Sequence, residues 1–112
     1  MISIKSIAPE ILPFLAEEAG LRFQDGLRGM IASDGEHTVG SVFYKNGEPV
    51  KILALTAADR GIAAGLCRAA LFPLYEGGTR EFELCCRPAV PLPPCYPVSG
   101  RGKLAALFGK NC

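Results

Sequence analysis

The feature that most constrains the fold is a β–α–β unit within residues 50–84. Positions 52 to 55 are all apolar, which is typical of a strand buried on both faces of a sheet. Residues 61–75 are rich in alanine and leucine and predict a helix, and residues 80–84 alternate in polarity as a strand does. Because such crossovers join parallel strands, we expect strand 50–55 to lie centrally in a sheet, parallel to strand 80–84.

Local patterns predict further elements on both sides of this unit. Asp34-Gly35 separates two apolar runs within residues 29–44, which indicates a hairpin with a type I′ turn, and Asn46-Gly47 marks a second turn. The remaining expectations are a strand over 1–7, a helix over 9–19, a connector over 21–28, a proline-rich surface segment over 87–97 and a short helix within 99–110. This order predicts a single α/β (α+β) domain over residues 1–112, with a mixed, mostly antiparallel sheet of about five strands and helices on its faces.

Composition excludes several classes of protein. Of 112 residues, 49% are hydrophobic and 21% are charged, which is typical of one globular domain. The formal net charge of +1 argues against a nucleic-acid partner. No segment approaches the roughly 20 apolar residues that cross a membrane, and the first residues do not resemble a signal peptide. The odd number of cysteines, five, then favours reduced thiols in the cytoplasm.

A candidate anion site lies where strand 50–55 leads into the helix. Asp59 can cap the helix, and Gly61, Ala63, Ala64 and Gly65 have little or no side chain to block the first backbone N–H groups. Those groups carry partial positive charge, and the Arg60 guanidinium adds a full one. The pattern therefore favours a phosphate or pyrophosphate site, with the alternative that Gly61 and Gly65 only let the helix pack closely on the sheet.

The segment from Arg60 to Gly65 resembles the Arg/Gln-x-x-Gly-x-Gly/Ala motif of GCN5-related N-acetyltransferases (GNATs), with Ala63 in place of the first motif glycine. The resemblance extends over residues 29–84 and implies a short member of that superfamily with an acyl-CoA N-acyltransferase-like fold. It implies acetyl-coenzyme A as co-substrate and an unidentified amine as acetyl acceptor. In the family, motif amides hold the pyrophosphate, which corresponds here to Arg60, Gly61, Ile62, Ala63, Ala64 and Gly65. The preceding strand pairs with the pantetheine arm, which corresponds to Leu53, Ala54 and Leu55.

The resemblance also directs attention to two candidate catalytic residues. A tyrosine after the fifth family strand often protonates the leaving thiolate, and Tyr96 is the tyrosine that follows the matched strand here. Acetyl transfer needs a base to deprotonate the amine, yet strand 50–55 contains no carboxylate. Glu83 is the candidate base, with the alternative that Glu81 and Glu83 only mark a solvated strand face.

Two other interpretations remain open at this stage. The chain could be a degenerate, non-catalytic relative that serves as a binding or dimerisation module, since a short sheet leaves edges that a second copy could cover. The cysteines could instead define a redox or metal protein. Cys85 and Cys86 are adjacent and no C-x-x-C pair is present, so we expect no metal site.

Overall fold

The computed structural model describes residues 1–88, 90, 92, 96 and 100–108, and this part of the chain forms six strands and three helices. The strands are β1 (Ile2–Ser6), β2 (Leu27–Asp34), β3 (His37–Lys45), β4 (Val50–Ala57), β5 (Glu81–Leu84) and β6 (Gly100–Lys103). The helices are α1 (Leu12–Glu18), α2 (Arg60–Glu76) and α3 (Leu104–Phe108).

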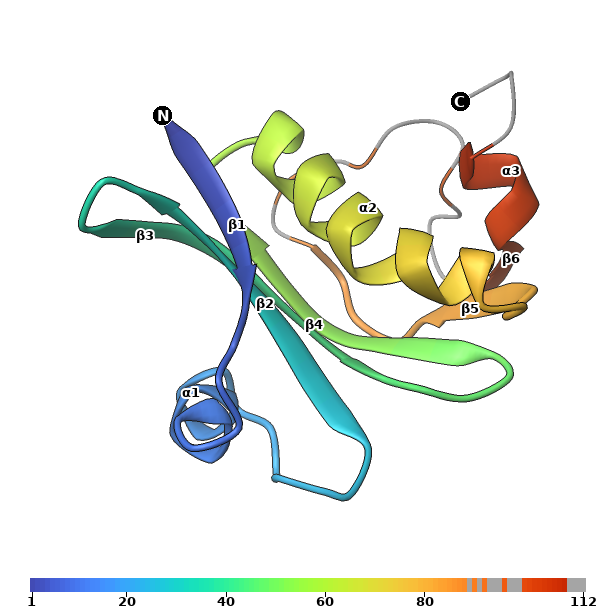
Figure 1. Ribbon diagram of the computed structural model, residues 1–112, viewed down its shortest axis with the longest axis horizontal. Coiled ribbons are helices and arrows are strands. Elements are labelled where there is room, and N and C mark those ends of the chain that lie inside the picture. Colours follow the sequence, from blue (N-terminus) through green and yellow to red (C-terminus); the bar gives the residue numbers. More distant parts are fainter. Residues whose placement is uncertain (89, 91, 93–95, 97–99, 109–112) are drawn as a thin grey trace.

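The six strands lie in one sheet in chain order, from β1 at one edge to β6 at the other. All neighbouring pairs are antiparallel except β4 and β5, which are parallel with Val50 opposite Phe82 and Ile52 opposite Leu84. Helix α2 connects these two strands and lies against one face of the sheet (Figure 1). The sheet is therefore mixed and mostly antiparallel, with β4 in its interior, which confirms the expected fold class.

Helix α2 buries the larger of two apolar clusters against the sheet. Its inward side chains occur three or four residues apart, as an amphipathic helix requires, and Leu66 and Leu71 are fully buried. Strands β3, β4 and β5 meet the helix with side chains that include Val42, Ile52 and Phe82. Burial of this size is the dominant stabilising contribution in a domain of this length.

Gly40 of β3 permits a close approach between α2 and the sheet. A Cβ atom at this position would lie 2.8 Å from the Thr56 carbonyl oxygen and 3.0 Å from Cδ1 of Leu66. The first neighbour is backbone and cannot rotate away. A residue with a side chain at position 40 would therefore push the helix or β4 outward.

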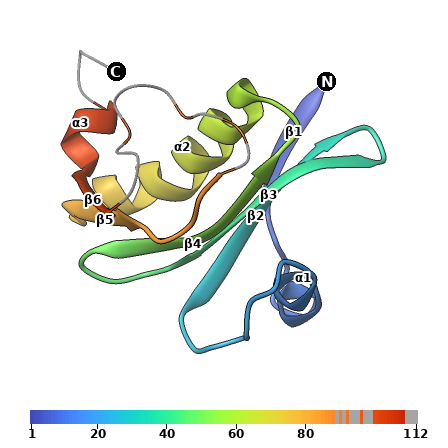
Figure 2. The ribbon, with the colours of Figure 1, turned by 180° about the vertical axis from the view of Figure 1, so that it is seen from behind.

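Helix α1 covers the opposite face of the sheet (Figure 2). Leu12 and Ala16 are buried there with Ile7, Leu27 and Phe43, which form a second, smaller cluster. Pro13 lies in the first turn of α1, where its missing N–H has no helical partner to lose. Residues 9–11, expected to be helical, form a turn instead, so α1 is shorter than predicted.

The β2–β3 hairpin is present, but its turn differs from the expected type. Asp34 pairs with His37, so the two loop residues are Gly35 and Glu36. Gly35 has a φ of +63°, whereas no non-glycine residue of the described chain has a positive φ. A type I′ turn needs two positive values, so this prediction was wrong, and the single positive φ at the first loop position is that of a type II′ turn.

The C-terminal part of the sheet also differs from the sequence prediction. Strand β6 was not expected, because two of its four residues are glycines, and its pairing with β5 supplies the structure instead. Helix α2 continues through Pro73 to Glu76. The expected surface segment over 87–97 is exposed at Arg87 but not at Tyr96, which is buried; residues 89, 91, 93–95 and 97 of this segment lie outside the described residues.

Candidate functional site

Strands β4 and β5 separate after a short parallel pairing. Their register ends at Ile52 opposite Leu84, and one further bond is donated by the Cys85 N–H to the Ile52 carbonyl at 2.9 Å. Beyond this point β4 continues to Ala57, and in the part of the chain that the structure describes it pairs there with β3 alone. Among the described residues, the β5-facing backbone of β4 over residues 53–57 therefore has no strand partner, and we call it the unpaired edge of β4.

A β-bulge marks the place of this separation. Tyr44 of β3 faces Ile52, while the preceding Phe43 faces Ala54, so Leu53 is an extra residue in β4. Bulges bend a strand and increase its local twist, which is consistent with β4 leaving β5 here. Leu53 and Ala54 are half-buried and pack against the α1 cluster, whereas Leu55 is buried in the α2 cluster. The three residues expected to hold a pantetheine arm thus direct their side chains into the two cores and leave their backbone at the separation.

Cys86 contacts the unpaired edge of β4. Burial raises the pKa of the Cys86 thiol, the neighbouring Cys85 raises it further, and the nearby Leu55 backbone opposes both. The chain itself therefore places a side chain against this edge.

The start of α2 is capped by Asp59. The Ile62 N–H donates to Oδ1 of Asp59 at 2.9 Å, and the Ala63 N–H donates to the Asp59 carbonyl at 3.1 Å. Ala64 and Gly65 already lie within the helix, where their N–H groups bond to carbonyls four residues earlier. Arg60 to Gly65 is thus helical rather than an open loop. Among the described residues, only the Arg60 and Gly61 N–H groups of this stretch lack an acceptor.

The two glycines of the motif occupy different surroundings. A Cβ atom at Gly65 would lie 3.1 Å from Cδ1 of Ile4 in β1, so this glycine lets the helix pack on the sheet. Gly61 is exposed, and a Cβ atom there would meet only Oδ1 of Asp59, at an ordinary 3.4 Å. The open surface at the helix start is therefore formed by Arg60 and Gly61.

The charges at the helix start oppose one another. Arg60 and Asp59 are both exposed, and neither forms an ion pair with another described residue. The Arg60 guanidinium and the helix dipole attract an anion, whereas the Asp59 carboxylate repels it. The helix start thus presents two amides without acceptors among the described residues and one guanidinium, beside one fixed negative charge.

Tyr96 lies on the α2 side of the sheet, against Phe82, with 6.0 Å between the ring centroids. Burial raises the pKa of the Tyr96 phenol well above its usual value of about 10, and Cys67 contributes further. The hydroxyl lies close to the Cys67 sulfur on α2, and each group shifts the pKa of the other. The phenol is therefore protonated at neutral pH, as a proton donor must be, but it faces Cys67 in the core.

Glu83 lies on the other face of the sheet from Tyr96, because it follows Phe82 in the same strand and successive side chains alternate. It stands in register between Lys51 of β4 and Arg101 of β6. These three residues line a hollow of about 330 Å³ at the β3–β4 turn. The structure therefore does not bring the two candidate catalytic residues together.

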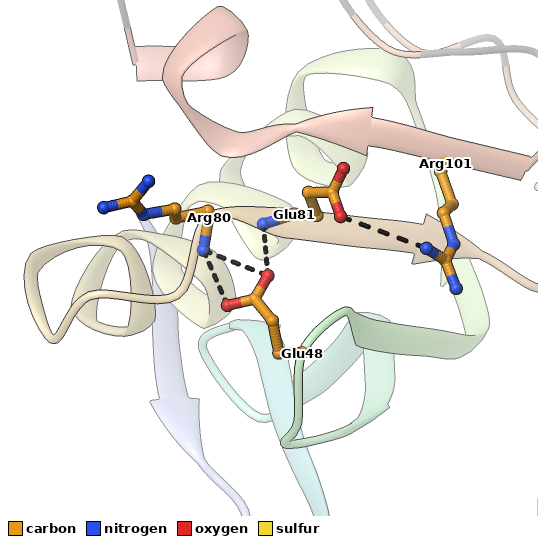
Figure 3. Close-up of polar contacts among 4 residues, drawn as sticks. All are labelled: Glu48, Arg80, Glu81 and Arg101. Atoms are coloured by element: carbon orange, nitrogen blue, oxygen red, sulfur yellow. Dashed lines mark hydrogen bonds and ion pairs between the residues drawn. The ribbon is translucent and has the colours of Figure 1, made fainter.

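Sequence reasoning missed Glu48, which fixes the start of β5. Its carboxylate accepts hydrogen bonds from the Arg80 N–H at 3.0 Å and from the Glu81 N–H at 2.9 Å (Figure 3). Nothing in the local sequence around Pro49 indicates these partners, which lie more than thirty residues away. Sequence reasoning also considered Cys86 only for its thiol chemistry. Its position at the separation of β4 and β5 could not be predicted, because that separation is not visible in the sequence.

The arrangement defines an α/β protein in which a sheet opens beside the N-terminus of its crossover helix. Three solved structures share this fold. The chain matches the ribosomal-protein-S18-alanine N-acetyltransferase of Escherichia coli with a TM-score of 0.59 and 10% identity, over 75% of this chain and 66% of that one. It matches the IAA acetyltransferase of Bacillus cereus with a TM-score of 0.56 and 18% identity, over 75% and 65%.

The third is a GNAT-family protein from Desulfovibrio desulfuricans, matched with a TM-score of 0.55 and 11% identity over 75% of this chain and 72% of that one. The chain thus has a GNAT-like fold, and it spans slightly less than two thirds of the length of the first two proteins. No protein-family sequence profile and no curated protein sequence matches it. None of the helices in the described residues is long and apolar enough to cross a membrane.

Proposed function

We propose that the protein binds acetyl-coenzyme A at the separation of β4 and β5 and transfers the acetyl group to an amine. The observation that carries this proposal is the unpaired edge of β4 over residues 53–57, beside two free amides at the start of α2. Acyl transfer is also what the names of the first two structural neighbours state for those proteins.

The residues of this chain fit such a co-substrate in part. The backbone of Leu53 to Leu55 can pair with an amide-containing arm, as an edge strand pairs with an extended peptide. Arg60 and the free amides can hold a pyrophosphate. When bound, acetyl-coenzyme A supplies an activated acetyl group: a C–N bond to the amine forms, the C–S bond breaks, and a proton passes from the amine to the thiolate.

Proton movement is the less complete part of this site. Glu83 is the candidate to accept the proton of the amine, and Tyr96 or Cys86 to donate one to the thiolate. Of these, Cys86 lies at the unpaired edge itself, close to the Leu55 backbone. A raised thiol pKa keeps that proton in place at neutral pH, which suits a donor.

A second function is favoured by two contacts. Asp59 occupies the Ile62 N–H at the helix start, and the Cys86 side chain lies close to the Leu55 backbone at the edge of β4. A site whose donors are used internally would suit a degenerate relative that serves as a binding or dimerisation module. In that case the exposed edge strands β1 and β6 are the surfaces that a second copy would cover.

The experiment that separates the two functions has a binding stage and a transfer stage. Coenzyme A is titrated calorimetrically into the wild type, Arg60→Gln and the matched control Arg22→Gln, an exposed arginine in the connector before β2. We expect about tenfold weaker binding for Arg60→Gln only, since charge-assisted hydrogen bonds contribute about 1.5–3 kcal/mol and exposure reduces this. No binding at millimolar coenzyme A would refute the acetyltransferase and any coenzyme A-binding module, and would leave only a dimerisation module.

The transfer stage uses acetyl-coenzyme A with a panel of primary amines, and mass spectrometry detects the acetylated product. Product formation supports the transferase. Binding without any product, together with a dimer in analytical ultracentrifugation, supports the module. Either function is compatible with the cytoplasm, where the free thiols of Cys67, Cys85 and Cys86 remain reduced.

A further inference from the structure

A hollow among the described residues lies at the far end of α2 from its cap. It measures about 720 Å³ and is bordered by the end of α2, the start of β5 and the junction of β6 with α3. Its lining includes Glu48, Tyr75, Gly78, Arg80, Glu81 and Lys103. Arg60 and Tyr75 are separated by about 22 Å along the helix at 1.5 Å per residue, so this hollow is distinct from the proposed acetyl-coenzyme A site.

The acidic groups of the hollow are already engaged. The Glu48 carboxylate accepts hydrogen bonds from the backbone N–H groups of Arg80 and Glu81. The Glu81 carboxylate turns toward Arg101, with 3.9 Å between Oε2 and Nη1 (Figure 3). Both negative charges are therefore partly balanced by donors that face them.

The basic groups of the hollow are not engaged in the same way. Figure 3 shows the Arg80 guanidinium directed away from the Glu48 carboxylate, so only the backbone of Arg80 contacts that acid. Lys103 is exposed at the end of β6. Among the described residues neither side chain forms an ion pair. The hollow thus presents two cations that can meet an anion.

One wall of the hollow is a positioned aromatic ring. Tyr75 is 37% exposed, and its ring packs against Phe108 of α3 in a tilted arrangement, with 5.4 Å between the ring centroids and 30° between the ring planes. Phe108 is held in turn by Phe72, edge-on at 5.2 Å. Gly78 leaves the neighbouring surface open, since a Cβ atom at this position would have no atom of the described residues within 4 Å. A flat ring can therefore approach the exposed part of Tyr75.

We propose that this hollow binds a small ligand that combines a planar aromatic ring with a carboxylate or phosphate group. Its volume falls within the range of roughly 300–1,000 Å³ typical of small-molecule sites. Arg80 and Lys103 would hold the anion through charge-assisted hydrogen bonds, and Tyr75 would stack on the ring. The ring and the anion together define the ligand class, because each contact addresses a different part of it.

The test compares phenyl phosphate and benzoate with inorganic phosphate and benzyl alcohol in amide-resolved NMR titrations. We expect the two ring-bearing anions to shift the amides of Gly78, Arg80, Glu81 and Lys103, and to bind at least fivefold more tightly than phosphate or the neutral ring. Arg80→Gln and Lys103→Gln should each weaken the binding of the ring-bearing anions about fivefold. Arg22→Gln is the matched control and should leave their affinity unchanged.

Two further readouts keep the proposal falsifiable. Tyr75→Leu should weaken the binding of phenyl phosphate but not that of inorganic phosphate. If this variant binds phenyl phosphate as tightly as the wild type does, the stacking role of Tyr75 is overturned. If Tyr75→Leu does not fold, Arg80→Gln decides alone, because that side chain is exposed and its backbone bond to Glu48 remains. Shifts confined to Arg60 and Gly61, or displacement of the probe by coenzyme A, would also overturn the proposal while leaving the acetyl-coenzyme A site in place.

Discussion

The carboxylate of Asp59 accepts a hydrogen bond from the Ile62 N–H, with 2.9 Å between Oδ1 and N. This bond gives α2 its N-terminal cap, which typically contributes about 1 kcal/mol to stability. It also holds a negative charge beside the Arg60 and Gly61 amides that we propose to hold pyrophosphate. One side chain therefore stabilises the helix and opposes an anion at the same place.

The first prediction separates these two effects. Asp59→Asn should leave the free energy of unfolding nearly unchanged, because asparagine caps helices as well as aspartate. It should tighten coenzyme A binding about three- to tenfold at low salt, since like charges about 4 Å apart in water repel by roughly 1 kcal/mol. Calorimetric titration and urea unfolding measure the two quantities.

Asp59→Ala is the matched comparison. It also removes the charge, but it should lower stability by about 1 kcal/mol because the cap is lost. The gain in affinity should fade for both variants in 0.5 M salt, where screening is strong. Unchanged affinity of Asp59→Asn at low salt would contradict the assignment of the helix start as the anion site.

The second prediction concerns the close approach at Gly40. Gly40→Ala should lower the free energy of unfolding by about 1–3 kcal/mol, because its Cβ atom would lie 2.8 Å from the Thr56 carbonyl oxygen. Gly61→Ala is the control and should be neutral or slightly stabilising, since alanine is favoured in helices by up to about 1 kcal/mol and its Cβ atom has room. Equal stability of the two variants in urea unfolding would contradict this packing.

The elements that could be predicted from the sequence are those whose pattern is local. The apolar run at 52–55 and the helix after Asp59 identify the crossover, and the parallel pairing of β4 and β5 follows from it. Asp59 was expected as the cap and occupies that position. These features depend on periodicity and on short-range hydrogen bonds, which a sequence displays directly.

The features that could not be predicted depend on contacts between distant segments. Strand β6 has little intrinsic strand preference and exists through its pairing with β5. Glu48 accepts hydrogen bonds from the N–H groups of Arg80 and Glu81, and no local sequence pattern indicates this contact. The reason for Gly65 also depends on a distant segment. The sequence shows only a small residue at this position, whereas the structure shows that its small size lets α2 pack against Ile4 of β1.

The third prediction concerns the contact between Glu48 and the start of β5. Glu48→Ala should lower stability by about 1–2 kcal/mol, because two backbone N–H groups lose a charged acceptor. Glu48→Gln should cost less, since its amide oxygen can still accept one of these bonds. Glu36→Ala, at the exposed β2–β3 turn, is the control and should change urea unfolding by no more than about 0.5 kcal/mol. A cost for Glu48→Ala as small as that of the control would refute this role.

The fourth prediction is a loss of stability at alkaline pH that originates in the pair formed by Cys67 and Tyr96. Burial raises the pKa of the Cys67 thiol from 9.0 to about 12, with a further contribution from Cys86. Between these two values the unfolded chain releases a proton that the folded chain retains. The free energy of unfolding should therefore be unaffected by Cys67 below pH 9 and should fall as the pH rises toward 12, by up to about 1.4 kcal/mol per pH unit.

The slope of the free energy of unfolding against pH, rather than its value at one pH, identifies the group whose titration lowers stability. Cys67→Ala should lower stability at pH 7 because it leaves a cavity, yet its stability should fall less steeply between pH 9 and 11. Tyr96→Phe should also flatten the curve, chiefly above pH 10, because burial raises the pKa of that phenol as well. Cys85→Ala is the control: the pKa of Cys85 is also raised, but this thiol is exposed and should contribute little. Urea unfolding from pH 7 to 11 measures all four proteins, and a slope for Cys67→Ala as steep as that of the wild type would show that the buried thiol does not titrate with folding.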